Sequence, residues 1–145
     1  RGSKPVILKG SWALRDLDET ELKRLTFFSS VVLNGDAGVT VDNCAFVESG
    51  RLRASGVADL RITHSLFFRP LLLDNCSTVY LSGNMYAGSP GVHLLNDRQT
   101  ILYSDYNSYA VTPDAPFCWR TSRENTVRLP GRARLSLHRC RSLPA

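Results

Sequence analysis

The hydrophobic and polar positions between Ser30 and Ala110 follow one short pattern that occurs four times. In each copy two apolar residues flank one variable residue, two or three small polar residues follow, and an aromatic residue closes the copy. The copies are VTVDNCAF, LRITHSLF, VYLSGNMY and ILYSDYNSY, which begin at Val39, Leu60, Val79 and Ile101. Their starts lie 21, 19 and 22 residues apart. Such a period predicts a solenoid, in which each coil buries its apolar face against its neighbours.

A second apolar group precedes each copy, so that each repeat contains two strand segments. These groups lie at residues 31–33, 52, 71–73 and 92–95. Turn-forming residues separate the two segments, namely Asn34-Gly35-Asp36, Ser55-Gly56, Asp74-Asn75 and Asn96-Asp97. We therefore predict an all-β fold, a parallel β-helix solenoid of about four to six coils over residues 30–112.

Alternation along each strand predicts which side chains enter the core. Val39 and Val41 point inward in the first copy, and Ile101 and Tyr103 do so in the last. The predicted outward row is Thr40, Arg61, Tyr80 and Leu102. The predicted polar column, able to hydrogen-bond from coil to coil, is Cys44, Ser65 and Asn84, joined by Asn107 if the last copy has one inserted residue. The predicted internal aromatic stack is Phe46, Phe67, Tyr86 and Tyr109.

The N-terminal residues 1–29 are predicted to be a cloning remnant, Arg1-Gly2-Ser3, followed by a cap. The apolar run at residues 5–8 predicts a short strand. Residues 11–25 predict a helix, because Asp18 suits an N-cap with Glu21 three residues later. The predicted apolar face of this helix is Leu14, Leu17, Leu22 and Leu25.

The pattern V-x-L-S-x-N-x-Y, together with residues 103–109, resembles the late coils of bacterial proteins in the pectin-lyase-like superfamily. The resemblance covers about residues 28–112 and implies a right-handed parallel β-helix in an extracellular or cell-envelope location. That superfamily includes lyases, hydrolases, epimerases and non-catalytic binders. Its enzymes commonly have ten or more coils, so the small number of coils in this chain favours a module without a complete polysaccharide active site.

Charge and cysteine content add limits. The net charge of +5 comes from the end of the chain, where residues 118–145 hold seven arginines against Glu124. Residues 113–145 are predicted to be an irregular basic cap or tail, and a nucleic-acid partner is not favoured. No apolar run approaches the roughly 20 residues that cross a bilayer, so no membrane partner is expected. The four cysteines, predicted as free core thiols with disulfide and metal roles left open, are Cys44, Cys76, Cys118 and Cys140.

The acidic residues do not match a lyase or hydrolase site. The candidates are Asp36, Asp42, Asp59, Asp74, Asp97 and Asp105, most at turn positions where Asp bonds its own backbone. His64 also lies in a turn and is predicted to be exposed and structural. No zinc spacing, phosphate-binding loop or Ser/His/Asp order is present.

The outward basic and aromatic residues favour binding. The predicted ligand-binding residues are Arg53, Arg61, Tyr80 and His93, because arginine pairs with carboxylates and tyrosine stacks on sugar rings. We expect a non-catalytic module that binds acidic polysaccharide, with no cofactor. One alternative is a fragment of a polysaccharide lyase or glycoside hydrolase, for which calcium would be the metal. The other is a structural module that forms homo-oligomers through the solenoid ends.

Overall fold

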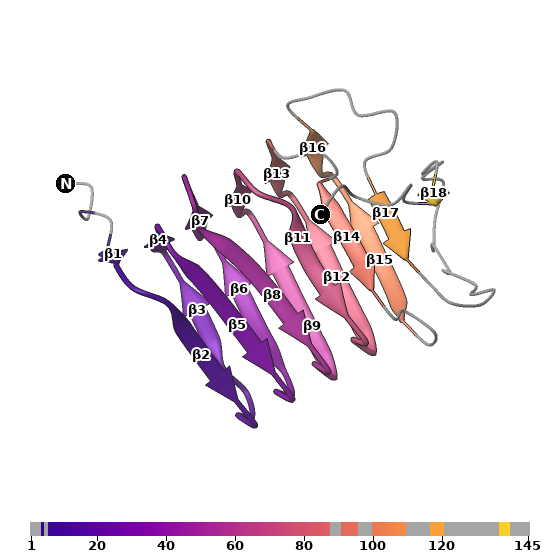
Figure 1. Ribbon diagram of the computed structural model, residues 1–145, viewed down its shortest axis with the longest axis horizontal. Coiled ribbons are helices and arrows are strands. Elements are labelled where there is room, and N and C mark those ends of the chain that lie inside the picture. Colours follow the sequence, from indigo (N-terminus) through magenta and orange to yellow (C-terminus); the bar gives the residue numbers. More distant parts are fainter. Residues whose placement is uncertain are drawn as a thin grey trace.

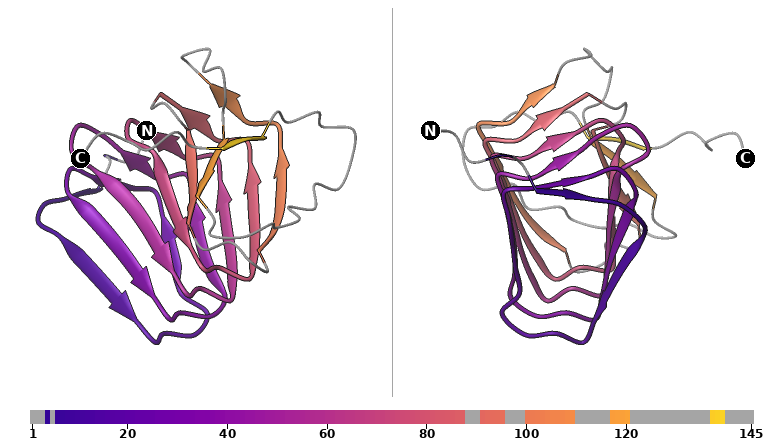
Figure 2. Two further views of the ribbon diagram at one scale, coloured as in Figure 1. Left: turned by 45° about the vertical axis from the view of Figure 1, so that its right-hand side comes forward. Right: turned by 90° about the vertical axis from the view of Figure 1, so that its left-hand side faces the viewer.

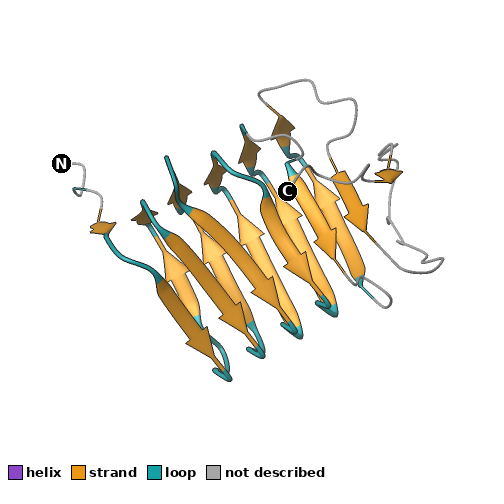
Figure 3. Ribbon diagram, viewed as in Figure 1, coloured by secondary structure: helices purple, strands orange, loops and turns teal. Residues whose placement is uncertain are grey.

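The described part of the chain is a parallel β-solenoid of about five turns. The computed structural model describes residues 4, 6–87, 91–95, 100–109, 117–120 and 137–139. These residues form strands and turns, with no helix among them (Figure 3). Each strand pairs in parallel with the strand at the same place in the neighbouring coil, as Figure 1 shows. The predicted parallel β-helix architecture is therefore confirmed.

Three sheets enclose the core. Sheet A runs in the order β1 (Val6–Leu8), β4 (Leu25–Phe27), β7 (Ala45–Phe46), β10 (Leu66–Phe67), β13 (Met85–Tyr86) and β16 (Ser108–Tyr109). Sheet B runs in the order β2 (Trp12–Arg15), β5 (Ser30–Asn34), β8 (Arg51–Ser55), β11 (Leu71–Asp74), β14 (Val92–Leu95), β17 (Phe117–Arg120) and β18 (Leu137–Arg139). Sheet C runs in the order β3 (Glu21–Lys23), β6 (Val39–Asp42), β9 (Asp59–Thr63), β12 (Thr78–Ser82) and β15 (Ile101–Asp105). Sheets B and C face each other, and sheet A closes the third side (Figure 2).

The core forms where the inward rows of the three sheets meet. In β9, for example, Leu60 and Ile62 are fully buried, whereas Arg61 between them is exposed. Sheet A contributes a column of stacked rings with centroids 4.9 to 5.3 Å apart, made of Phe27, Phe46, Phe67 and Tyr86. The predicted internal aromatic stack is confirmed for these coils. Burial of large rings in register is a main source of stability in such a fold.

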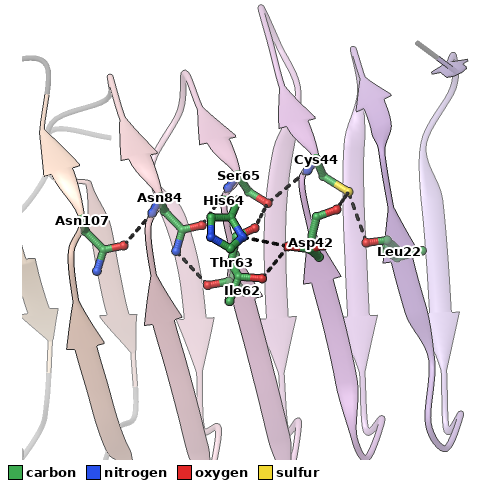
Figure 4. Close-up of polar contacts among 9 residues, drawn as sticks. All are labelled: Leu22, Asp42, Cys44, Ile62, Thr63, His64, Ser65, Asn84 and Asn107. Atoms are coloured by element: carbon green, nitrogen blue, oxygen red, sulfur yellow. Dashed lines mark hydrogen bonds and ion pairs between the residues drawn. The ribbon is translucent and has the colours of Figure 1, made fainter. Parts of the chain in front are cut away.

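The predicted polar column is also confirmed, at the corner where sheet C turns into sheet A (Figure 4). The Cys44 N–H donates to Ser65 Oγ at 3.2 Å, and the Ser65 N–H donates to Asn84 Oδ1 at 2.9 Å. The Asn84 N–H donates to Asn107 Oδ1 at 3.0 Å. In return, Asn84 Nδ2 donates to the Ile62 carbonyl at 2.8 Å. Each coil therefore satisfies the backbone groups of the coil beside it.

The residue before each member of this column, and the equivalent residue of the first coil, has a left-handed backbone, which turns the chain by a sharp angle. These residues have φ values between 48 and 65° and are Arg24, Asn43, His64, Gly83 and Tyr106. Glycine and asparagine adopt this conformation at the lowest cost, which explains two of the five identities. The imidazole of His64 is exposed, as predicted from its turn position.

The predicted N-terminal helix is wrong. Residues 12–15, 21–23 and 25–27 are the strands β2, β3 and β4, which form one more coil. Leu14, Leu22 and Leu25 pack against the core, but Leu17 is 40% exposed. The strand state is preferred because β5, β6 and β7 offer pairing partners for the whole segment. The apolar run at residues 5–8 does contain a strand, β1, which pairs with β4.

The predicted inward and outward faces are wrong in the last repeat, by one residue. Leu102 pairs with Val79 and is fully buried, whereas Ile101 is 41% exposed. Tyr103 pairs with Tyr80 and takes the outward place predicted for Leu102. The extra residue of this repeat therefore precedes the strand, and Asn107 joins the polar column 23 residues after Asn84 without a further insertion.

Most of the predicted basic cap or tail at 113–145 lies outside the described residues. Within it, β17 and β18 add two parallel strands to sheet B beyond β14. The side chains of Cys118 and Tyr109 and all of Cys140 lie outside the described part of the structure, so the predictions made for them stay predictions.

Candidate functional site

The four predicted binding residues lie on two different sheets. Arg61 and Tyr80 point outward from β9 and β12 of sheet C, whereas Arg53 and His93 belong to β8 and β14 of sheet B. Because sheets B and C face each other across the core, their outward rows are on opposite sides of the molecule. Arg53 Nη2 lies 3.2 Å from a carboxylate oxygen of Asp74, and His93 is only 7% exposed. One ligand cannot contact all four.

On sheet C, Arg61 and Tyr80 do lie together, and Tyr103 extends their row. The guanidinium carbon of Arg61 lies 4.4 Å from the centre of the Tyr80 ring, a cation–π contact. The Tyr80 and Tyr103 rings stack with centroids 4.6 Å apart and an interplanar angle of 7°. Since β9 and β15 flank β12, both faces of Tyr80 are covered. A sugar can therefore reach the edge of this ring but not stack on its face.

The candidate carboxylates Asp36, Asp42 and Asp105 do not converge on a catalytic centre. Asp36 is buried and accepts the Leu17 N–H at 2.7 Å and the Asn34 N–H at 3.0 Å, which is the predicted turn role. Asp42 and Asp105 share one row of sheet C, but three strand spacings of about 4.8 Å separate their strands by roughly 14 Å. Paired glycosidase carboxylates are closer than this. Asp97 lies outside the described residues.

The described residues also contain no group of three or more His, Cys, Asp and Glu side chains that could hold a metal ion. Cys44 and Cys76 are buried thiols without a disulfide, as predicted. Burial raises the pKa of both thiols, so both are protonated at neutral pH. Their sulfur atoms face backbone carbonyls, those of Leu22 at 3.3 Å and Ala54 at 3.5 Å. These thiols are structural.

A concave feature lies along the corner between sheets C and A. It is a groove of about 550 Å³ that extends over the first three coils. Outward residues of sheet A, including Thr26, Ala45 and Leu66, line one side of it. Its lining contains no carboxylate side chain and four basic ones, Lys4, Lys23, Arg24 and His64. We refer to it as the corner groove.

Contacts at the corner fix the position of His64 (Figure 4). Its Nδ1 lies 3.1 Å from Asp42 Oδ1, and the Thr63 hydroxyl donates to the same oxygen at 2.7 Å. The hydrogen bond from Thr63, followed by that from His64, lowers the pKa of Asp42. On the other side the His64 ring lies over Gly83, where an added Cβ would come within 3.0 Å of the imidazole Cδ2. The imidazole is therefore held between two coils.

Two of the basic groups, His64 and Lys23, have acidic neighbours outside the groove lining, which are Asp42 and Glu21. Lys23 Nζ lies 2.9 Å from Glu21 Oε2, and both of these side chains are about half exposed. Exposed pairs of this kind contribute at most about 1 kcal/mol, so Lys23 can exchange this partner for an anionic ligand. The structure shows no ion pair for Arg24 among the described residues, so its guanidinium can donate hydrogen bonds to an anionic ligand.

Sequence reasoning missed Lys23 and Arg24 because residues 11–25 were interpreted as a helix, and it missed Lys4 because the N-terminal residues were interpreted as a remnant and cap. A signal for the first coil does exist. The segment ELKRLTF at residues 21–27 ends in a phenylalanine 19 residues before Phe46, as the repeat period requires. That alignment places Arg24 in the same turn position as Asn43 and His64.

Comparison with protein-family models, with curated proteins and with solved structures found no match. No helix in the described part of the chain is long and apolar enough to cross a membrane. The functional argument therefore depends on the geometry of the molecule.

Proposed function

We propose that this chain is a non-catalytic module that binds acidic polysaccharide in the corner groove. The observation that carries the proposal is the presence of four basic side chains, and no carboxylate, along one groove. Guanidinium and ammonium groups form charge-assisted hydrogen bonds with carboxylates and sulfates. Because the groove extends over three coils, a linear polymer with repeated anionic groups suits it better than a single small anion.

The proposal keeps the likeness to the pectin-lyase-like superfamily, its right-handed winding and an extracellular or cell-envelope location. Three parallel sheets and a coil-to-coil asparagine column support the likeness in fold. The separation of the described carboxylates supports binding without turnover. Arg61 and Tyr80 keep a role in the proposal as neighbours of the groove on sheet C, whereas Arg53 and His93 of sheet B have none.

The test is isothermal titration with an oligogalacturonate. Arg24→Asn removes a cation from the groove without backbone strain, because Asn43 has φ 53° at the same turn position of the next coil. We expect about tenfold weaker binding, equivalent to about 1.4 kcal/mol. Arg51→Gln, on sheet B, removes the same charge away from the groove and should leave the affinity unchanged. Equal losses in both variants would indicate non-specific attraction and contradict the proposal.

The non-catalytic part has a separate test. Oligogalacturonate incubated with the protein, with and without calcium, should show no rise in unsaturated-uronate absorbance and no new reducing ends. Turnover in either condition that scales with protein concentration would replace this proposal with the lyase or hydrolase alternative.

A second candidate function is end-to-end assembly, and the first coil carries the observation that favours it. Among the described residues, strands β1, β2 and β3 are terminal strands of the three sheets. Val6, Ile7 and Trp12, all on these strands, are 44 to 54% exposed. Unpaired edges with apolar side chains favour pairing with another chain. Sedimentation should then show a mass above 16.1 kDa that Trp12→Lys reduces to that of one chain; a monomeric wild type would exclude assembly.

A further inference from the structure

A second, smaller cavity lies on the outer side of sheet C. Its volume is about 200 Å³, and it lies between β12 and β15, two coils beyond the groove's central strands. It is lined by Tyr80, Leu81, Ser82, Tyr103, Ser104 and Asp105. We call it the tyrosine pocket. Two phenol rings, the Ser82 hydroxyl and one carboxylate give it a chemistry opposite to that of the corner groove, because its lining contains no basic side chain.

The hydrogen bonds within the tyrosine pocket leave suitable atoms for a ligand. Asp105 Oδ1 accepts the Tyr106 N–H at 2.9 Å, which leaves Oδ2 as an acceptor. Ser82 pairs with Asp105 in the outward row, so its hydroxyl can donate to the same ligand. A carboxylate beside hydroxyls matches the adjacent hydroxyl groups of a sugar ring. The same carboxylate repels an anionic sugar at this position.

The pocket and the groove lie along one corner of the solenoid. Ser82 and Asp105 line the pocket and directly precede Gly83 and Tyr106. These two residues have positive φ values at the turn from sheet C to sheet A, the position that Arg24 and His64 occupy in earlier coils. The corner position between the groove and the pocket is Gly83, which has no side chain, and the His64 ring lies over it. Neighbouring coils are about 4.8 Å apart, so the first and fifth coils are separated by roughly 19 Å. That length suits a short oligosaccharide.

We propose that the tyrosine pocket binds an uncharged sugar unit of the same linear glycan whose acidic units occupy the corner groove. The inference rests on the proposed function and specifies the ligand class: a glycan that contains both uronate and uncharged sugar units. His64 lies at the junction between the two sections. Tyr103, which stacks on Tyr80, forms the outer wall against which the uncharged unit packs.

The test compares two series of oligosaccharides by isothermal titration. One series alternates glucuronate and N-acetylglucosamine and has two, four or six units. The other is oligogalacturonate of the same lengths. For the alternating series we expect at least tenfold tighter binding of six units than of two. For oligogalacturonate we expect the affinity to rise little with length once the groove is filled, because Asp105 repels a further uronate.

Two variants separate the pocket from the groove. Tyr103→Ala should weaken binding of the alternating hexasaccharide about tenfold and leave the affinity for the disaccharide unchanged. Asp105→Asn keeps the Oδ1 acceptor for the Tyr106 N–H. Because it removes the repelling charge, the affinity for oligogalacturonate should then rise with length. Circular dichroism and thermal melting of both variants establish that the solenoid is intact.

The outcomes distinguish this inference from the proposed function. Loss of binding in Arg24→Asn together with unchanged hexasaccharide binding in Tyr103→Ala would overturn the pocket alone. No binding of any probe to the wild type would overturn the groove and the pocket together. Tighter binding of glucosamine than of N-acetylglucosamine would assign the pocket to an ammonium ligand and overturn the inference.

Discussion

Asn84 shows how a single side chain joins neighbouring coils. It is buried, its Oδ1 accepts the Ser65 N–H, and its Nδ2 donates to the Ile62 carbonyl. Asn84→Ala leaves a buried N–H without its acceptor, so we expect the free energy of unfolding to fall by about 1–3 kcal/mol. Urea denaturation measures this loss. Asn84→Ser is the matched control, because Ser65 fills the same position one coil earlier. It should lower the free energy of unfolding clearly less than Asn84→Ala does. Equal losses would contradict the role of the column.

Asp42 gives the fold a defined pH dependence. Its pKa in the folded protein is lowered from the usual 3.8, chiefly by the Thr63 hydroxyl. The stabilisation is therefore complete above pH 4 and is lost as the pH falls through the lowered value. Thr63→Val should reduce stability at neutral pH, and its difference from the wild type should shrink below pH 4. Urea titrations at pH 7, 5 and 3 measure this, and a difference independent of pH would contradict it.

The polar column could be predicted from the sequence, but the faces of the last strand could not. A small polar residue two positions before each aromatic identifies the column directly. The alternation of Ile101, Leu102 and Tyr103 fits either register, because all three side chains are large and largely apolar. A slip of one residue exchanges the two faces of a strand, and only pairing with Val79 and Tyr80 decides between them.

Among the elements, the turn between β7 and β8 depends on Gly50. A Cβ at this position would overlap the carbonyl oxygen of Phe27 and lie 2.8 and 2.9 Å from the backbone O and N of Val47. Backbone atoms cannot move aside easily, so Gly50→Ala should destabilise the protein by about 1–3 kcal/mol or more. Gly38→Ala is the control, with an unfavourable φ of 68° but no contact closer than 3.6 Å. Thermal melting should show the larger loss for Gly50; the reverse order would contradict this account.

The first coil shows why local pattern alone misassigned an element. Leu14, Leu22 and Leu25 fit an amphipathic helix, and the surrounding Glu and Lys residues favour helices as well. They equally fit short strands separated by turns at Asp16 and Arg24, both with positive φ. Nothing within residues 11–25 separates the two interpretations. The deciding interaction is non-local, because the strands of this coil pair with those of the next.

At the scale of the whole molecule, the solenoid determines which outward residues can act together. Alternation identified Arg53 and Arg61 as outward, but it could not show that they lie on sheets B and C. The outer faces of these two sheets are on opposite sides of the molecule. The corner groove was beyond local prediction for a related reason. Its basic residues come from three coils and from a segment interpreted as a helix, and only stacking aligns Arg24 with His64.

The most direct test of the central claim is an NMR titration of the isotope-labelled chain with trigalacturonate. The account predicts that the largest backbone amide shifts occur at Arg24, Asn43 and His64 along the corner groove, with little change on sheet B around Arg53 and His93. Raising the salt concentration should reduce the affinity, because the contacts are ionic. Shifts centred on sheet B, or no shifts at millimolar ligand, would contradict the corner groove as the binding site.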